Sequence, residues 1–436
     1  MLDILFKDIA IITMEGRQAV IQNGYLGVSG SVIAIVGRGK CDEPAKRVID
    51  GRGKLIMPGI VNTHAHTPMC IMRGYADDYN LQDWLYNKIF PVESRLDERA
   101  VRLGSALAFA ELIRNGVTSV TDMYFHIPEI AQAALEAGIK INLSNALMCF
   151  DESTFDFAAT RTAKETLKLL REYHGAGGGR IRADVSVHAA YTCPPAEIAL
   201  MSSFAKEHEL NMHIHLSETK REHIEVIEKY GKTAAEIFCE NGAFDVRATA
   251  AHCVWVSDGD IGIMAEKHVT CAHNPVSNLK LGSGIAPIAK MKKAGVNIAL
   301  GTDGCASNNT HDMFEEIKLS ALLQKGTTLD PTSVSAYDAL EFATVNGARA
   351  QGRLEECGSL RAGKQADIIM LDMTSPSLVP SYDPVAAVVY SARGSDVVLT
   401  MVQGKILYEN GEFLTIDYEK TAAEVNKYCV PIVRGE

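Results

Sequence analysis

The strongest constraint on the fold is an alternation of strand-like and helical segments in the middle of the chain. Between residues 58 and 356, eight apolar runs alternate with helical stretches such as 100–115 and 158–173. The predicted strands are residues 60–66, 118–123, 140–148, 182–189, 211–216, 248–253, 269–273 and 296–303. Repeated strand–helix units form parallel sheets, and eight of them predict an α/β fold of the (β/α)8 TIM-barrel type.

Both flanks of this region have a different pattern. Segments 8–14 and 32–36 before it, and 366–371, 387–390 and 397–402 after it, are rich in Ile, Val and other strand formers. Such short runs, broken by Gly, are typical of small antiparallel strands. We therefore expect residues 1–57 and 357–436 to form one small β-sandwich, with the catalytic barrel at 58–356.

Composition excludes several classes of partner. There are 43 Lys and Arg residues against 54 Asp and Glu, a formal net charge of −11, whereas nucleic-acid-binding surfaces are basic. No apolar run approaches the roughly 20 residues that span a bilayer. The ten Cys include no CxxC pair, and no signal pattern stands at the N-terminus. We expect a cytoplasmic protein without a nucleic-acid or membrane partner.

Polar residues that can bind a metal stand at the ends of four predicted strands. His64 and His66 end the first strand, and residues two apart in a strand point to the same side. His215, His252 and Asp303 end the fifth, sixth and eighth strands. An HxH pair alone is equally compatible with two hydrogen-bonded loop histidines. Because active sites of such barrels form at the carboxyl ends of the strands, four of these positions together favour a metal site.

These motifs resemble the amidohydrolase superfamily. The resemblance rests on residues 58–66 (PGIVNTHAH), the His215…Glu218 pair, His252, Asp303 and the returning segment 358–367 (GSLRAGKQAD). Within the superfamily, the sequence is most similar to the 5′-methylthioadenosine/S-adenosylhomocysteine deaminases and the related triazine chlorohydrolases.

The resemblance implies one divalent metal ion, with a water completing its shell. Its ligands would be His64, His66, His215 and Asp303. His213 competes with His215, but the family places the ligand three residues before the Glu. Members with two metals carry a bridging Lys on a middle strand, and no Lys ends predicted strands two to four here. Zn²⁺ is expected, with Fe²⁺ or Mn²⁺ as alternatives because His and Asp bind several metals.

The same resemblance assigns the catalytic groups. Glu218 would protonate the ring nitrogen beside the attacked carbon and help ammonia leave. Asp303 would take the water proton, and His252 would hydrogen-bond the attacking hydroxide. Considered alone, Glu218 is equally well explained as a carboxylate at the start of a helix.

Four further residues are implied as substrate contacts. His188 would hydrogen-bond the purine, Trp84 would cover the ligand, and Glu93 would accept hydrogen bonds from the ribose hydroxyls. Arg161 would bind the homocysteine carboxylate, although segment 144–150 lacks the second Arg of some members. The alternatives are a core histidine, a packed aromatic, a solvated charge and an exposed helix-start cation, respectively.

Three functions remain open. The first is hydrolytic deamination of an adenosine-type nucleoside: 5′-methylthioadenosine, S-adenosylhomocysteine, 5′-deoxyadenosine or adenosine. The second is another amidohydrolase activity, such as that of a guanine deaminase or a triazine chlorohydrolase, and the third is a metal-free scaffold. Glu93 favours a nucleoside because a bare base or triazine has no diol. The sequence leaves the 5′-substituent and the oligomeric state open, a homo-oligomer included.

Overall fold

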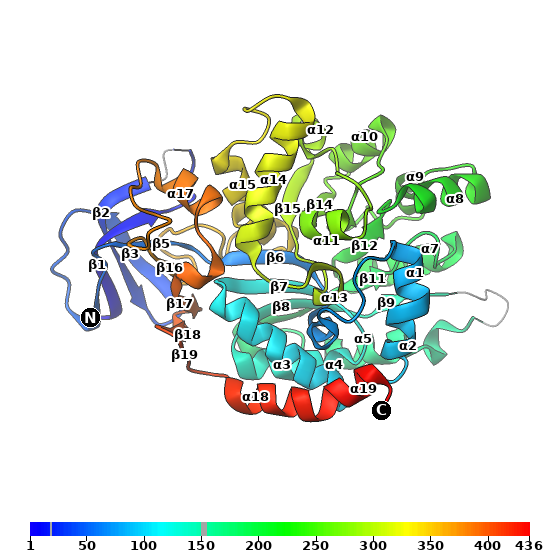
Figure 1. Ribbon diagram of the computed structural model, residues 1–436, viewed down its shortest axis with the longest axis horizontal. Helices are drawn as coiled ribbons and strands as arrows, with labels where there is room; N and C mark the ends of the chain where they lie inside the picture. The colour runs from blue at the N-terminus through cyan, green and yellow to red at the C-terminus, as the bar shows by residue number, and fades with distance from the viewer. Residues whose placement is uncertain (18–19, 150–154) are drawn as a thin grey trace.

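Two parallel sheets occupy the middle of the molecule, and a mixed sheet lies at one side (Figure 1). The computed structural model describes residues 1–17, 20–149 and 155–436. The parallel sheets have the orders β10-β8-β7-β6 and β15-β14-β13-β12-β11-β9. Their strands are β6 Ile60–Ala65, β7 Val117–Met123, β8 Lys140–Ser144, β9 Ala146–Leu147, β10 Ile181–Ala183, β11 Val185–Val187, β12 Met212–Leu216, β13 Ala248–His252, β14 Thr270–His273 and β15 Asn297–Leu300.

All eight predicted strands are present, but the third and fourth are each broken once. β8 and β9 are separated at Asn145, and β10 and β11 at Asp184, so β8 pairs with β10 while β9 pairs with β11. The first and last strands are also linked, because the Asp303 amide donates to the His64 carbonyl at 2.9 Å. The carboxyl ends of these strands therefore approach one another.

Helices separate successive strands, as the alternation predicts. They are α3 Glu98–Arg114, α4 Ile127–Ala137, α5 Arg161–Glu172, α6 Ala176–Gly179, α7 Pro195–Glu207, α8 Lys220–Tyr230, α9 Ala234–Glu240, α10 Asp258–Glu266, α11 Pro275–Lys280, α12 Ile288–Lys293, α13 Cys305–Asn308, α14 Met313–Thr328, α15 Ala336–Phe342 and α16 Val345–Ala350. In α3, the Asp97 carboxylate accepts from the Ala100 amide and caps the first turn. None of the helices in the described ranges is long and apolar enough to cross a lipid bilayer.

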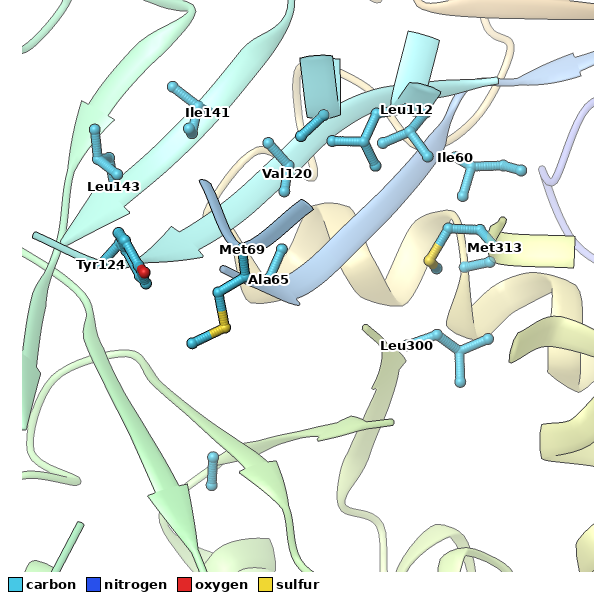
Figure 2. Close-up of a cluster of buried hydrophobic side chains, with 14 of the residues drawn as sticks. Ile60, Ala65, Met69, Leu112, Val120, Tyr124, Ile141, Leu143, Leu300 and Met313 are labelled. Atoms are coloured by element: carbon cyan, nitrogen blue, oxygen red, sulfur yellow. The ribbon is translucent and has the colours of Figure 1, made fainter. Parts of the chain in front are cut away.

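Apolar side chains from adjacent strands and helices form the core beneath the site. Figure 2 shows Ile60, Val120 and Ile141, which lie on three neighbouring strands, together with Leu112 of α3 and Met313 of α14. All five are fully buried. Burial of each such side chain contributes about 1.5–3 kcal/mol. Truncating Leu112 to Ala would cost about 2–5 kcal/mol, so this core holds the strand ends in place.

The two ends of the chain share one nine-stranded sheet of order β19-β18-β17-β16-β5-β1-β2-β3, with β4 paired to β1. The strands are β1 Leu2–Ile12, β2 Val20–Ser29, β3 Val32–Arg38, β4 Ala45–Asp50, β5 Lys54–Pro58, β16 Ile368–Asp372, β17 Val397–Val402, β18 Lys405–Glu409 and β19 Glu412–Phe413. β5 pairs antiparallel with β16. One apolar cluster joins Phe6, Leu26 and Ile56 to Met370 and Leu399.

The prediction of a strand at residues 387–390 is wrong, because this segment belongs to helix α17, Pro384–Tyr390. The Asp383 side chain accepts from the amides of the first turn, and Pro384 occupies a position that favours a helix start. Val385, Val388 and Val389 are buried, at the spacing of one helix face.

The end of the chain is helical, which the sequence pattern did not indicate. It forms α18 Tyr418–Glu424, a π-helical turn Val425–Cys429 and α19 Val430–Arg434. Figure 1 shows this segment in red, below α3. The Tyr428 hydroxyl donates to Asp97 at 2.5 Å, and Arg95 donates to the Ile432 carbonyl at 3.0 Å. The last residues therefore pack near α3 rather than on the mixed sheet.

Candidate active site

The carboxyl ends of β6, β12, β13 and β15 bring the predicted metal ligands together. Oδ1 of Asp303 lies 3.4 Å from Nε2 of His64 and 3.2 Å from Nε2 of His66. The ring centroids of His64 and His215 are 4.9 Å apart. Ring nitrogens of His64, His215 and His252 lie within 4.8 Å of one another. The fold thus gathers imidazole nitrogens and one carboxylate around a single point.

Hydrogen bonds behind the site orient the imidazole rings. Nδ1 of His66 donates to the Met123 carbonyl at 2.5 Å, and Nδ1 of His215 donates to the His188 carbonyl at 2.8 Å. Nδ1 of His64 lies 3.0 Å from Nε2 of His213. His213 therefore lies behind His64 and supports its ring. Each of these contacts leaves Nε2 of the supported ring available to the site.

This donor set fits a divalent metal. Nε2 of His64 is buried and has no hydrogen-bond partner among the described residues. A buried imidazole nitrogen is normally paired, so an unpaired one that faces a carboxylate and other imidazoles calls for a ligand. Nitrogen and carboxylate donors in this number are those that zinc and related ions take from proteins.

Asp303 is held by residues whose role the sequence did not reveal. Its backbone has a positive φ of 63°. Oδ2 accepts from the hydroxyls of Ser277 at 2.6 Å and Ser307 at 3.0 Å, and Oδ1 accepts from the Gly304 amide at 2.8 Å. Ser277 lies on α11 and Ser307 on α13, and both helices directly follow predicted strand ends, which was the available signal.

His252 is oriented by Asn278, the neighbour of Ser277 on α11. Nδ1 of His252 donates to Oδ1 of Asn278 at 2.8 Å. A neutral His252 therefore has its free lone pair on Nε2, which lies 3.7 Å from Oε2 of Glu218. One short helix thus contacts both Asp303 and His252 through adjacent residues.

Glu218 does not cap the helix that follows it. Thr219 and Glu222 form the capping box of α8, with the Thr219 side chain accepting from the Glu222 amide. The Glu218 carboxylate instead accepts from the Ser283 hydroxyl at 3.2 Å and is buried. Burial raises the pKa of Glu218, so the carboxyl group holds its proton at higher pH than an exposed glutamate.

A cavity of about 840 Å³, including its mouth, extends from this cluster and holds three of the predicted substrate contacts. Trp84, Glu93, His188 and Glu218 line it. Trp84 ends α1, Leu81–Trp84, and Glu93 ends α2, Phe90–Glu93, with the π-helical turn Leu85–Ile89 between them. Trp84 is buried and faces the cavity, and Glu93 is half-buried rather than a solvated charge.

Burial also shifts the pKa values of two polar residues in the cavity lining, Glu93 and His188. It raises the pKa of Glu93, which lies close to the Tyr124 hydroxyl and to His66. Burial and the nearby histidines lower the pKa of His188 to about 3. His188 is therefore neutral at physiological pH, and its Nδ1 lies 2.9 Å from the Thr192 hydroxyl. A neutral imidazole has one donor and one acceptor nitrogen, so it can donate or accept a hydrogen bond with a purine.

Arg161 lies outside the cavity lining. It is the first residue of α5, it is exposed, and its guanidinium lies 5.7 Å from the ring centroid of Phe125, which does line the cavity. Of segment 144–150, Phe150 lies outside the described residues. The structure thus brings together every predicted site residue except Arg161, which lies outside the cavity lining.

Comparisons with known proteins agree with this geometry. The model of the amidohydrolase family matches residues 55–407. The chain is 43% identical to the 5-methylthioadenosine/S-adenosylhomocysteine deaminase of Acetivibrio thermocellus, covering 99% of this chain and 100% of that protein. It is 42% identical to the 5′-deoxyadenosine deaminase of Methanosarcina mazei, covering 99% of each. A zinc-bound structure of an adenosine deaminase from Xanthomonas campestris superposes with a TM-score of 0.94 at 30% identity, over 100% of this chain and 99% of that one. The chain belongs to the amidohydrolase family.

Proposed function

We propose that this protein is a metal-dependent hydrolytic deaminase of adenosine-type nucleosides. It would convert the 6-amino group of 5′-methylthioadenosine, 5′-deoxyadenosine, S-adenosylhomocysteine or adenosine into the oxo group of the inosine analogue and release ammonia. The observation that carries the proposal is one cavity that contains the metal-binding cluster, a buried acid and a second carboxylate, Glu93. The names of the relatives, at 42–43% identity over nearly the full length, support the same reaction.

His64, His66, His215 and Asp303 would hold one divalent ion, with Zn²⁺ as the expected metal. When bound, such an ion supplies a Lewis acid that makes water nucleophilic near neutral pH. Asp303 accepts a water proton through the carboxylate that its two serine donors keep in place. Nε2 of His252, the nitrogen with the free lone pair, accepts a hydrogen bond from the same water and directs its oxygen toward the substrate.

Glu218 carries the proton to the substrate. Burial raises its pKa, which favours the protonated carboxyl group that can protonate the purine nitrogen beside the attacked carbon. After attack, the Glu218 carboxylate can accept the remaining proton of the added hydroxyl group and pass it to the departing amino group, so that the oxo group forms as ammonia leaves. The proton held by Asp303 then restores Glu218. A general acid of this kind contributes typically about 10²–10⁴-fold to the rate.

Glu93 favours a nucleoside over a bare base or a triazine. Two carboxylate oxygens can accept hydrogen bonds from the two ribose hydroxyls, whereas guanine and a chlorotriazine have no such diol. The cavity lining contains no Lys or Arg among the described residues, and Arg161 lies outside it, near the lining residue Phe125. An uncharged 5′-substituent would therefore bind better than the charged homocysteine group.

Ammonia release from a substrate panel tests this proposal. The panel contains adenosine, 5′-deoxyadenosine, 5′-methylthioadenosine, S-adenosylhomocysteine, guanine and a chlorotriazine, each assayed with the zinc-loaded protein. We expect the highest kcat/KM for 5′-deoxyadenosine or 5′-methylthioadenosine. A preference for guanine, or chloride release from the triazine, would replace the nucleoside assignment with the second function.

The architecture around the site is part of the proposal. We infer that the two parallel sheets form one (β/α)8 barrel at 58–356, because β6 and β15 are hydrogen-bonded at their ends. Residues 1–57 and 357–436 would supply the accompanying β-sandwich domain, supported by their shared sheet and apolar cluster, although the last helices, α18 and α19, lie near α3. Ten cysteines without a CxxC pair support a cytoplasmic location. The proposed partner is a small-molecule nucleoside, not nucleic acid or membrane.

A further inference from the structure

A second group of side chains that could hold a metal ion lies near the strand end that precedes Asp303. It consists of Glu111 on α3, Cys305 at the start of α13, and His311 between α13 and α14. One ligand atom of each lies within 4.8 Å of those of the other two. Cys305 and His311 are fully buried, and the Glu111 side chain is 22% exposed.

The tautomer of His311 follows from its partners. The Thr302 hydroxyl donates to the Asp303 carbonyl at 3.1 Å, so its oxygen is left to accept from Nδ1–H of His311 at 3.0 Å. The remaining ring nitrogen, Nε2, then carries a lone pair. That atom is buried and has no hydrogen-bond partner among the described residues. An unpaired buried lone pair of this kind is costly unless a donor or a metal meets it.

One lone pair of the Glu111 carboxylate is directed at the Cys305 thiol. Oε1 accepts from Arg73 and from the His311 amide, both at 3.1 Å. Oε2 accepts from Arg73 at 2.5 Å and from the Cys305 thiol, whose Sγ lies at 4.0 Å. A carboxylate offers about four lone-pair sites. Three are taken by N–H donors, and the fourth accepts from the Cys305 thiol, so it becomes available to a cation when the thiol loses its proton.

From this geometry we propose that Glu111, Cys305 and His311 form a second site for a thiophilic divalent cation of the zinc class, separate from the active site. This proposal does not depend on the deaminase assignment. Thiolate, imidazole and carboxylate together select zinc-like ions over magnesium or calcium. As the ion binds, the Cys305 thiol releases its proton to solvent, and thiolate and carboxylate offset the two positive charges. Arg73 stays outside the site and orients the carboxylate through its hydrogen bonds.

An ion bound at this second site would link α3 to the segment that follows Asp303. Cys305 and His311 flank Ser307, which donates to Asp303. An ion bound by Glu111 of α3 would therefore fix the segment that holds this active-site carboxylate. Binding to the folded state alone would also stabilise the protein.

Cobalt substitution tests the second site directly, because the active-site donors include no thiolate. Metal-free full-length protein, kept reduced, is titrated with Co²⁺, and absorption and metal content are recorded without substrate. We expect a thiolate-to-cobalt charge-transfer band in the near ultraviolet and one more ion per chain than the active site binds. Zn²⁺ should abolish the band.

Cys305→Ala should lose the band and one equivalent of metal while keeping the active-site ion, which also reports correct folding. His311→Gln should weaken Co²⁺ binding at the same site. Cys70→Ala is the matched control, because this buried thiol donates to the Gly104 carbonyl at 2.9 Å and is not one of the three ligands; it should keep the band. Absence of the band in the wild type, or its persistence in Cys305→Ala, would overturn the proposal.

Discussion

The carboxyl group of Glu218 is surrounded by groups that act on its proton in opposite directions. Burial and the charge of Asp303 raise its pKa, whereas His252, the Ser283 hydroxyl and His66 lower it. Burial is the largest of these effects, so the net shift is upward. This is the direction that a general acid needs at neutral pH.

Glu218→Gln should retain metal and lose most of the activity, by at least about 10²–10⁴-fold, because the amide cannot transfer a proton. The measurement is kcat/KM for 5′-methylthioadenosine beside metal content. Glu225→Gln is the control, since Glu225 lies on α8 and its side chain is 51% exposed. If Glu218→Gln kept a tenth of the wild-type rate with full metal content, Glu218 would be excluded as the acid.

Ser283→Ala should move the alkaline limb of the kcat/KM profile to higher pH. The hydroxyl donates to the carboxylate form of Glu218 and lowers its pKa, so its removal raises that pKa. The acid must be protonated to act, so activity is present below the pKa and is lost above it. A limb that stays in place or moves to lower pH would contradict this account.

At the scale of elements, α11 supports the site through two adjacent side chains. Asn278→Ala removes the acceptor of Nδ1–H of His252, and we expect a loss of about 10–100-fold in kcat, the scale for residues that orient a functional group. Nitrogen-15 NMR of the histidines should show the His252 tautomers becoming mixed. Leu279→Ala, at an exposed position of the same helix, should leave both unchanged. A pure Nδ1–H tautomer of His252 in the Asn278→Ala protein would remove Asn278 from this role.

The segment from α1 to α2 places Trp84 and Glu93 over the cavity. Glu93→Ala should lower kcat/KM for 5′-methylthioadenosine. The corresponding loss of transition-state stabilisation should be about 2–4 kcal/mol, the scale for losing hydrogen bonds to a charged group. Turnover of any bare base should be unaffected, because the contact lies away from the reacting carbon.

Arg161→Ala supplies the contrast to Glu93→Ala. Because Arg161 lies outside the cavity lining, this change should spare activity on 5′-methylthioadenosine. A loss of activity on S-adenosylhomocysteine alone would show that Arg161 contacts the homocysteine carboxylate. Unchanged nucleoside turnover in Glu93→Ala would argue that the diol is bound elsewhere.

Strand positions could be predicted because they depend on local spacing, and the same spacing places the proposed metal ligands at neighbouring strand ends. His64 and His66 are two residues apart on one strand, and the other candidates stand at strand ends. The supports of Asp303 could not be predicted, because Ser277 reaches it only through the packing of α11 against α13. The strand expected at 387–390 failed for another reason: a run of Ala and Val suits both a strand and a buried helix face, and the cap at Asp383 decided the outcome.

At the scale of the whole molecule, a buried ion pair joins the mixed sheet to the parallel sheets. Lys140 of β8 contacts Asp367, which precedes β16, and both are buried. Lys140→Met should lower the free energy of unfolding by about 3–5 kcal/mol, because Asp367 is left as a buried, unpaired charge.

Urea-induced unfolding of the zinc-loaded protein measures this effect. The double variant Lys140→Met/Asp367→Asn should recover much of the loss, since it removes the unpaired charge and leaves a side chain that can still accept from the Gln403 amide. Equal loss in both variants would assign the effect to packing around Lys140 rather than to charge.

The pairing of β5 with β16 also has a consequence for biosynthesis. Residues 54–58 leave the ribosome early, but their partner at residues 368–372 emerges only after most of the chain has been made. At about 5–20 residues per second, the nascent chain exposes the free edge of β5 while the central strands are being translated. The N-terminal strands must therefore remain protected from aggregation during translation, and a truncated product that stops before residue 368 would leave this edge permanently unpaired.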